Sequence, residues 1–92
     1  IHFFVGPARM KVQLRYFASI REALGTGSEV LDTQARTLAE LRAELVARGG
    51  TYAEALAPGN SVRVALNQTM SDETAALSEG AEVGFFPPVT GG

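Results

Sequence analysis

One amphipathic helix is the feature that most constrains the fold of this sequence. Its start is marked by Thr37 three residues before Glu40, the spacing of a capping box, and Gly49-Gly50 stops it. Between these signals the apolar residues recur at helical spacing, so one face must be buried against another element. The apolar face comprises Leu38, Leu41, Leu45 and Val46, and the expected solvent face comprises Glu40, Arg42, Glu44 and Arg48, with Glu44 and Arg48 placed for an i, i+4 ion pair.

The rest of the chain supplies strands for this helix to cover. Residues 11–17 alternate polar and apolar side chains, so that Val12, Leu14 and Tyr16 face one way. Further strands are expected at 28–32, 62–67 and 81–86, short helical segments at 19–25 (with a Ser19–Glu22 capping box and a Gly25 end) and 52–56, and a polar loop at 68–78. The order predicts an α+β domain, with one main helix across one face of a small mixed sheet.

The composition argues against several kinds of site. The 92 residues contain no Cys and one His, His2, which removes disulfides, thiolate zinc sites, a cysteine nucleophile and a Ser-His-Asp triad. The net charge of −2 does not suit a dedicated nucleic-acid binder. The apolar runs are far shorter than the ~20 residues that span a bilayer. We therefore expect a cytoplasmic protein that binds no metal, no nucleic acid and no membrane.

The two ends of the chain differ from the middle. Residues 1–9 start without Met, and Gly6-Pro7 separates them from the strand pattern behind Met10. We expect a leader that derives from the cloning vector or from upstream translation, the alternative being an additional strand at Phe3-Phe4-Val5. The β-rich domain proper is expected at 10–86, followed by a flexible tail at 87–92.

The tail carries unusual chemistry. Pro87-Pro88 ends the last strand, because proline offers no N–H to a ladder, and it holds the exit extended. Thr90-Gly91-Gly92 has almost no side chain, which suits a narrow channel in another protein. The reactive group is the α-carboxylate of Gly92. It can attack the α-phosphorus of ATP to give an acyl-adenylate, from which a sulfur or nitrogen nucleophile displaces AMP.

Three passages carry a resemblance to a known family. They are Tyr16–Gly25 (Tyr-Phe-Ala-Ser-Ile-Arg-Glu-Ala-Leu-Gly), Val64–Gln68 (Val-Ala-Leu-Asn-Gln) and, most specifically, Glu82–Gly92 (Glu-Val-Gly-Phe-Phe-Pro-Pro-Val-Thr-Gly-Gly). Through them the chain from Met10 to Gly92 resembles the small, sulfur-carrying subunit of molybdopterin synthase. The family offers no counterpart to residues 1–9.

The resemblance implies a ubiquitin-like β-grasp fold and a carrier that is not an enzyme on its own. A ubiquitin-activating-type enzyme would use ATP to adenylate Gly92, and sulfur from a persulfide would convert it to a thiocarboxylate. The tail would then deliver sulfur to cyclic pyranopterin monophosphate in the active site of the large subunit, within a heterotetramer of two large and two small subunits. This chain would bind no cofactor itself. The implied partner-binding residues are Phe86, Pro87, Pro88, Val89, Thr90 and Gly91.

Other functions remain open at this point. Sulfur carriers of thiamine or cysteine biosynthesis share the fold and the terminal Gly-Gly, but their tails do not usually carry Phe-Phe-Pro-Pro-Val-Thr before it. A ubiquitin-like modifier would join Gly92 to a lysine through an isopeptide bond. A plain interaction module would have an inert tail.

Several further residues are candidates for partner contacts or chemistry. Phe85 and Phe86 should face opposite sides of the last strand, one in the core and one outward as an interface anchor, the alternative being that both pack internally. We expect Arg21 to be a solvated charge rather than a partner contact. Asp72-Glu73 is expected in a solvated turn rather than as an acid–base pair, and Asn67-Gln68 as a strand end.

Overall fold

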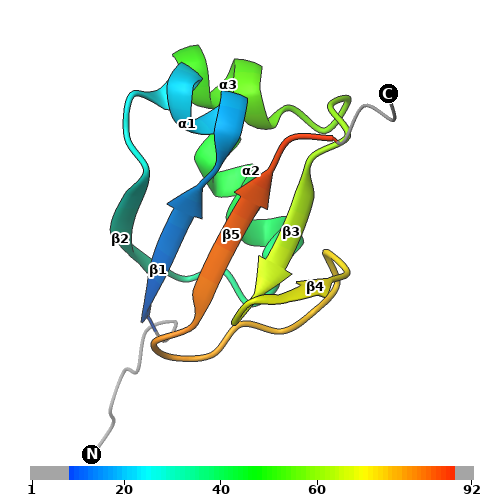
Figure 1. Cartoon of the computed structure of the whole chain (residues 1–92). Helices are drawn as coiled ribbons and strands as arrows, with labels where there is room; N and C mark the ends of the chain where they lie inside the picture. The colour runs from blue at the N-terminus through cyan, green and yellow to red at the C-terminus, as the bar shows by residue number, and fades with distance from the viewer. Residues whose placement is uncertain (1–8, 89–92) are drawn as a thin grey trace, which may run out of the picture.

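Within the described residues, 9–88 of the computed structural model, five strands form one mixed sheet in the order β2-β1-β5-β3-β4. The central pair β1–β5 is parallel, and the other neighbouring strands pair antiparallel (Figure 1). The parallel pairing brings the carboxyl ends of β1 and β5 to the same edge of the sheet. The strands are β1 (Met10–Tyr16), β2 (Ser28–Thr33), β3 (Arg63–Leu66), β4 (Thr69–Ser71) and β5 (Glu82–Phe86).

Three helices accompany the sheet in this part of the chain: α1 (Ala18–Leu24), α2 (Leu38–Val46) and α3 (Gly50–Leu56). α2 crosses one face of the sheet, whereas α1 and α3 gather at the end where β1 and β5 finish (Figure 1). This arrangement confirms the predicted α+β, ubiquitin-like β-grasp fold. None of the three helices has the length and apolar character to cross a membrane.

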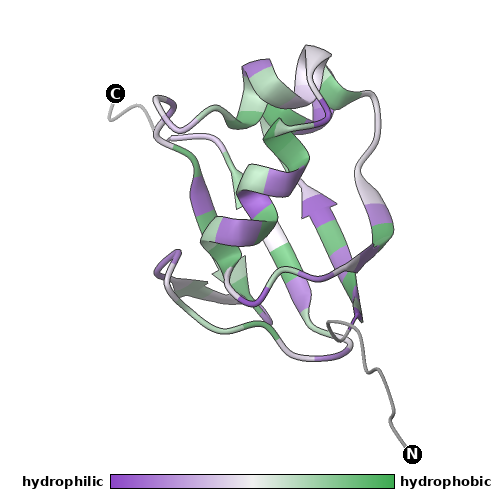
Figure 2. Cartoon of the chain, turned by 180° about the vertical axis from the view of Figure 1, so that it is seen from behind, coloured by the Kyte–Doolittle hydropathy of each residue, from purple (hydrophilic) through white to green (hydrophobic). Residues whose placement is uncertain are grey.

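The core lies between the sheet and α2. The alternation predicted for β1 is confirmed, because Val12, Leu14 and Tyr16 are buried while the residues between them are exposed. Tyr16 stacks on Phe85 of the neighbouring strand, with ring centroids 5.9 Å apart. The same alternation shows as bands of opposite hydropathy along the strands in Figure 2, where α2 lies in front of the sheet. From α2, the core receives Leu38, Leu41 and Leu45.

The start of α2 confirms the predicted cap. Thr37 Oγ1 accepts a hydrogen bond from the backbone N–H of Glu40 at 3.2 Å, which satisfies one of the free donors of the first turn. The Glu40 carboxylate reaches one residue further back than a standard capping box, to the backbone N–H of Arg36 at 2.7 Å. Both ends of the box therefore contribute.

The start of α1 corrects the sequence analysis. The expected Ser19–Glu22 capping box does not form, because the helix already begins at Ala18 and its N-cap is Phe17, which has no side-chain acceptor. Backbone pairing with β5 is the reason for this difference. The Phe17 N–H donates to Phe85 O at 3.1 Å, so the β1 ladder continues up to the first residue of the helix. Gly25 ends α1 in the left-handed conformation, as predicted.

β4 also corrects the sequence analysis, which expected a polar loop there. Asn67 and Gln68 have φ angles of 51° and 71°, and two left-handed residues in succession make the tight turn of a β-hairpin between β3 and β4. The prediction that Asn67-Gln68 ends a strand is confirmed. The hairpin itself was missed because glutamine is an unusual residue for this turn.

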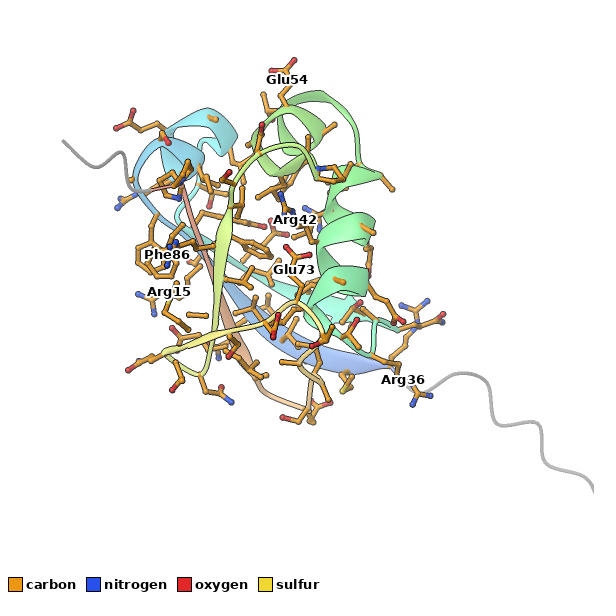
Figure 3. All side chains as sticks on the ribbon, turned by 90° about the vertical axis from the view of Figure 1, so that its right-hand side faces the viewer. Arg15, Arg36, Arg42, Glu54, Glu73 and Phe86 are labelled. Carbon is orange, nitrogen blue, oxygen red and sulfur yellow. The ribbon has the colours of Figure 1, made fainter. Side chains whose placement is uncertain are left out.

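Arg42 overturns the expectation that it lines the solvent face of α2. Its side chain is buried, and its Nε donates to Leu56 O at 2.7 Å. One terminal nitrogen donates to Ala57 O at 2.6 Å and Asn60 O at 3.0 Å. The other pairs with the carboxylate of Glu73 (Figure 3), so Glu73 lies in the predicted turn, partly exposed, but is ion-paired to the domain. One buried cation thus ties α2 to the α3–β3 loop and to the segment after β4.

Glu44 and Arg48 do not form the predicted i, i+4 pair. Glu44 accepts a hydrogen bond from the buried hydroxyl of Thr33, at the end of β2. Arg48 instead binds both carboxylate oxygens of Glu29, at 3.1 and 3.2 Å. Partners on β2 replace the predicted pair, because α2 ends at Val46, before Arg48, and packs over the sheet.

Glu29 is the centre of a second polar cluster. Its Oε2 also accepts hydrogen bonds from the hydroxyls of Tyr16 and Tyr52, each at 2.9 Å. The Arg48 guanidinium lies 4.6 Å from the centre of the Tyr52 ring. Burial acts to raise the pKa of Glu29, but the hydrogen bonds from Arg48, Tyr52 and Tyr16 outweigh it and hold that pKa below its usual value.

We predict that Arg42→Met lowers the free energy of unfolding by about 3 kcal/mol, the low end of the cost of breaking a buried ion pair, because Arg42 is buried but Glu73 is partly exposed. The substitution keeps the apolar stem but leaves three carbonyls and a carboxylate without their donor. Urea unfolding monitored by circular dichroism measures the change. Arg36→Met, at an exposed position, is the matched control and should shift stability by less than about 0.5 kcal/mol. Equal midpoints for the two variants would contradict the assigned role.

We predict that Glu29→Gln lowers the free energy of unfolding by about 2 kcal/mol at neutral pH. A carboxyl whose folded pKa is depressed contributes stability that is present above its unfolded pKa and is lost as pH falls through its folded pKa. Urea unfolding between neutral pH and about pH 2 should therefore show the two proteins converging in acid. Glu22→Gln, at an exposed position on α1, serves as the control. A Glu29→Gln difference independent of pH would refute the charge-based account.

Candidate functional site

The root of the tail leaves the domain from the middle of the sheet. β5 lies between β1 and β3 and ends at Phe86, after which Pro87 and Pro88 lead away near α1 and α3 (Figure 1). Proline ends the ladder here as the sequence predicts. Of the predicted site residues, Phe86, Pro87 and Pro88 are described, whereas Val89, Thr90, Gly91 and Gly92 lie outside the described residues.

Phe85 and Phe86 face opposite sides of the sheet. Phe85 is fully buried against Tyr16 in the core, while Phe86 is half-buried on the face that α2 does not cover. Figure 3 shows Phe86 and Arg15 together on this helix-free face. The prediction of one core and one outward phenylalanine is confirmed, and the alternative that both pack internally is wrong.

Phe86 does not stand alone on this face. Its ring stacks on that of Phe17, with centroids 4.3 Å apart and planes inclined by 2°. Gly84 lies beneath both rings, because a Cβ added there would sit 3.2 Å from a ring carbon of each. Glycine at this position therefore lets the two rings lie down against the sheet.

A strained backbone conformation at Ala18 accompanies the placement of Phe17. The next residue, Ala18, has a φ of 52°, a left-handed conformation that costs a non-glycine residue roughly 1 kcal/mol. This turn lets the chain pass from β1 into α1 while Phe17 keeps its backbone bond to β5 and its ring over Gly84. Such strain is often concentrated at functional surfaces.

A flat apolar surface results, which we call the outer-face patch. Ala65 of β3 pairs with both Gly84 of β5 and Met70 of β4, so these three residues share a face across adjacent strands. Met70 is 52% exposed, an unusual exposure for a large apolar side chain in a small domain. The patch comprises Phe17, Ala65, Met70, Gly84 and Phe86.

Basic residues flank the patch. Arg15 pairs with Gly84 in the β1–β5 register, and Arg63 pairs with Phe86 in the β3–β5 register. Both arginines are exposed, and Arg15 has a long contact of 3.8 Å with Glu82. An apolar centre with a charged rim is the usual composition of a protein–protein interface.

Sequence reasoning found Phe86 but missed Phe17, Met70 and the arginine rim. The signal for Phe17 was available, since the inward residues of the first strand are even-numbered and an odd-numbered phenylalanine must face the other side. Met70 had no such signal, because its strand was not predicted. Arg21 is exposed, in agreement with the expectation of a solvated charge.

The described surface offers apolar and charged groups to a partner. Within residues 9–88 no group of three His, Cys, Asp or Glu side chains is arranged to hold a metal ion. Glu82 contributes its backbone N–H to Asn67 Oδ1 at 3.0 Å, which fixes the β3–β4 turn beside β5. The site thus combines a tail root, an apolar patch and a charged rim on one rigid sheet.

The chain is similar in sequence to a known family and to two characterised relatives. The profile of the ThiS family matches residues 14–92. The molybdopterin synthase sulfur carrier subunit of Escherichia coli K12 is 37% identical over 81 residues, which covers 88% of this chain and 99% of the relative. The subunit of the same name from Haemophilus influenzae is 39% identical over 77 residues, which covers 84% of this chain and 94% of the relative.

A solved complex is also similar. It is the protein–protein complex of subunits 1 and 2 of the molybdopterin-converting factor from Helicobacter pylori. The matched chain has a TM-score of 0.61 and 32% identity, and the match covers 90% of this chain and 100% of that one.

Proposed function

The chain belongs to the ThiS family, and on that premise we propose that it is the sulfur carrier subunit of a molybdopterin synthase. The observation that carries the proposal is the Phe-Phe-Pro-Pro-Val-Thr-Gly-Gly sequence placed at the end of the central strand β5. The names of the two relatives, which align over nearly their whole length, support the same pathway rather than thiamine or cysteine biosynthesis or protein modification.

In the proposed reaction the Gly92 carboxylate attacks the α-phosphorus of ATP and pyrophosphate leaves. A persulfide sulfur then attacks the acyl-adenylate and AMP leaves, and reductive cleavage of the resulting acyl disulfide by a thiol gives the thiocarboxylate. A separate ubiquitin-activating-type enzyme catalyses the adenylation, so ATP is a substrate of that partner and this chain holds no cofactor. Because the activation consumes ATP, the proposal includes a cytoplasmic location.

The sulfur acceptor in the proposal is cyclic pyranopterin monophosphate, bound in the active site of the large subunit. The large subunit supplies the acids and bases, and this chain supplies the activated glycine. The similarity to a complex of subunits 1 and 2 supports a partner of this kind, which we propose assembles as two large and two small subunits. Transfer of the sulfur to the acceptor breaks the C–S bond of Gly92, and water supplies the oxygen that restores the carboxylate for another cycle.

The short distance from Pro88 to Gly92 brings the domain surface into the proposed contact with the partner. Gly92 lies four residues beyond Pro88, and a segment of this length spans at most about 14 Å. A partner that receives Gly92 in its active site must therefore contact the domain around the tail root. The outer-face patch, with the stacked Phe17 and Phe86 next to Pro87, offers the apolar anchor for that contact.

The first test is the intact mass of the protein after incubation with the activating enzyme, ATP and a sulfur donor. We expect a gain equal to the replacement of one oxygen by sulfur, because the thiocarboxylate forms at Gly92. The variant that lacks Gly92 is the control and should show no gain. A covalent conjugate with a lysine of another protein would instead indicate a modifier, and an unchanged mass with a competent activating enzyme would refute the carrier proposal.

The second test concerns the outer-face patch. Phe86→Asp should weaken binding to the large subunit by about tenfold or more, since it places a charge at the centre of an apolar interface. Isothermal titration calorimetry measures the affinity, and circular dichroism checks the fold. Ala43→Asp adds the same charge on the exposed side of α2 and should bind like the unaltered chain. Equal affinities for the two variants would remove the patch from the interface.

A further inference from the structure

A second surface, which is concave, lies beside the tail root on the side of α1 and α3. It is a groove of about 550 Å³, within the range of about 300–1,000 Å³ found for binding pockets. Pro87 and Pro88 form one wall, and the α3–β3 loop forms another. None of its described lining residues belongs to the outer-face patch, so the tail root separates two different surfaces.

The groove is mainly apolar at its base and acidic at its rim. Ile20 and Ala23 of α1, Ala55 of α3 and Val62 before β3 supply the apolar lining. Glu54 is the one charged residue among the described lining residues, and Figure 3 shows its side chain at the outer end of the molecule, directed away from the domain. An exposed carboxylate next to an apolar groove favours a partner that presents a basic side chain.

The shape of the groove is fixed before any partner binds. The buried Arg42 holds the carbonyls of Ala57 and Asn60 in the α3–β3 loop. The Asn60 side-chain amide donates to Glu54 O at 2.7 Å and Ala55 O at 3.2 Å, which joins the loop to the end of α3. A groove held in this way loses little conformational freedom when it is filled.

We propose that this groove receives an apolar side chain of the large subunit, flanked by a basic residue that pairs with Glu54. The proposal rests on the proposed function, because it requires a partner that grips the tail. The large subunit is the expected occupant because the groove is continuous with the root of the tail. The prolines that lead the tail into the partner are themselves a wall of the groove, so a protein that surrounds them also covers Ile20 and Ala23.

The charges at the edges of the two surfaces favour one orientation of the bound partner. The outer-face patch has a rim of arginines, Arg15 and Arg63, whereas the groove has Glu54 at its rim. A partner with acidic groups facing the sheet and a basic group facing α3 matches both surfaces in one orientation only. Reversed docking would place like charges together on both sides of the tail.

Variants at the groove test the proposal through affinity for the cognate large subunit. Ala23→Arg fills the groove from an exposed helix position and should weaken binding by about tenfold. Glu54→Lys reverses the rim charge and should weaken binding about two- to fivefold at low salt, with less effect at high salt. The matched controls are Ala43→Arg on α2 and Glu22→Lys on α1, both exposed and outside the groove lining.

Formation of the thiocarboxylate is measured on the same set of variants, together with their urea unfolding midpoints. Weaker binding by both groove variants, with normal thiocarboxylate formation and unchanged controls, would support the proposal. Unchanged affinity of Ala23→Arg or of Glu54→Lys would overturn it. A groove defect confined to thiocarboxylate formation would also overturn it and assign the groove to the activating enzyme. An unaltered chain that neither forms a thiocarboxylate nor binds the large subunit would show instead that the proposed function is wrong, and this inference with it.

Discussion

The parallel pairing of β1 with β5 is the constraint on which both candidate surfaces depend. Parallel strands finish at the same edge of a sheet, so the end of the first strand and the root of the tail become neighbours although they are far apart in sequence. This adjacency stacks Phe17 on Phe86 over the sheet. It also sets α1, which follows β1 at once, beside Pro87 and Pro88. An antiparallel pair at this position would separate the tail root from both.

Arg42 contributes the second constraint, since it fixes the elements that the sheet does not reach. The α3–β3 loop has few apolar contacts of its own, and its carbonyls would otherwise need water. A single guanidinium with several fixed donors satisfies two of these carbonyls and that of Leu56 at the end of α3, and it also pairs with Glu73. A lysine could not match this geometry, because it presents a point charge rather than a planar fork. The loop is thereby held against α3, and one wall of the groove is set.

The fold was predictable from the sequence wherever a local pattern determined the outcome. The alternation of β1, the Thr37 cap and the proline end of β5 each follow from short-range rules. Prediction failed where the local signal was unusual, as at the Asn67-Gln68 turn, and where the partner lies far away in sequence. Arg42 on α2 and Arg48 just after it fall where the helical pattern predicts solvent, and only the packed structure reveals that Leu56 and Glu29 are their partners. Of the candidate site, Phe86 was found through alternation, whereas the groove depends on how α1, α3 and the tail root come together.

A carrier that reacts through a glycine carboxylate, as proposed for Gly92, must obtain its specificity from elsewhere. The glycine carboxylate has no side chain for a partner to recognise, so discrimination between partners has to come from the domain surface close to the tail. Two surfaces of different character on either side of Pro87 and Pro88 meet this need. In the proposed complex the apolar patch with its arginine rim supplies an anchor, and the groove with Glu54 distinguishes the two possible directions of approach. Separate surfaces also allow successive partners to share one and differ in the other, while the same short tail serves both.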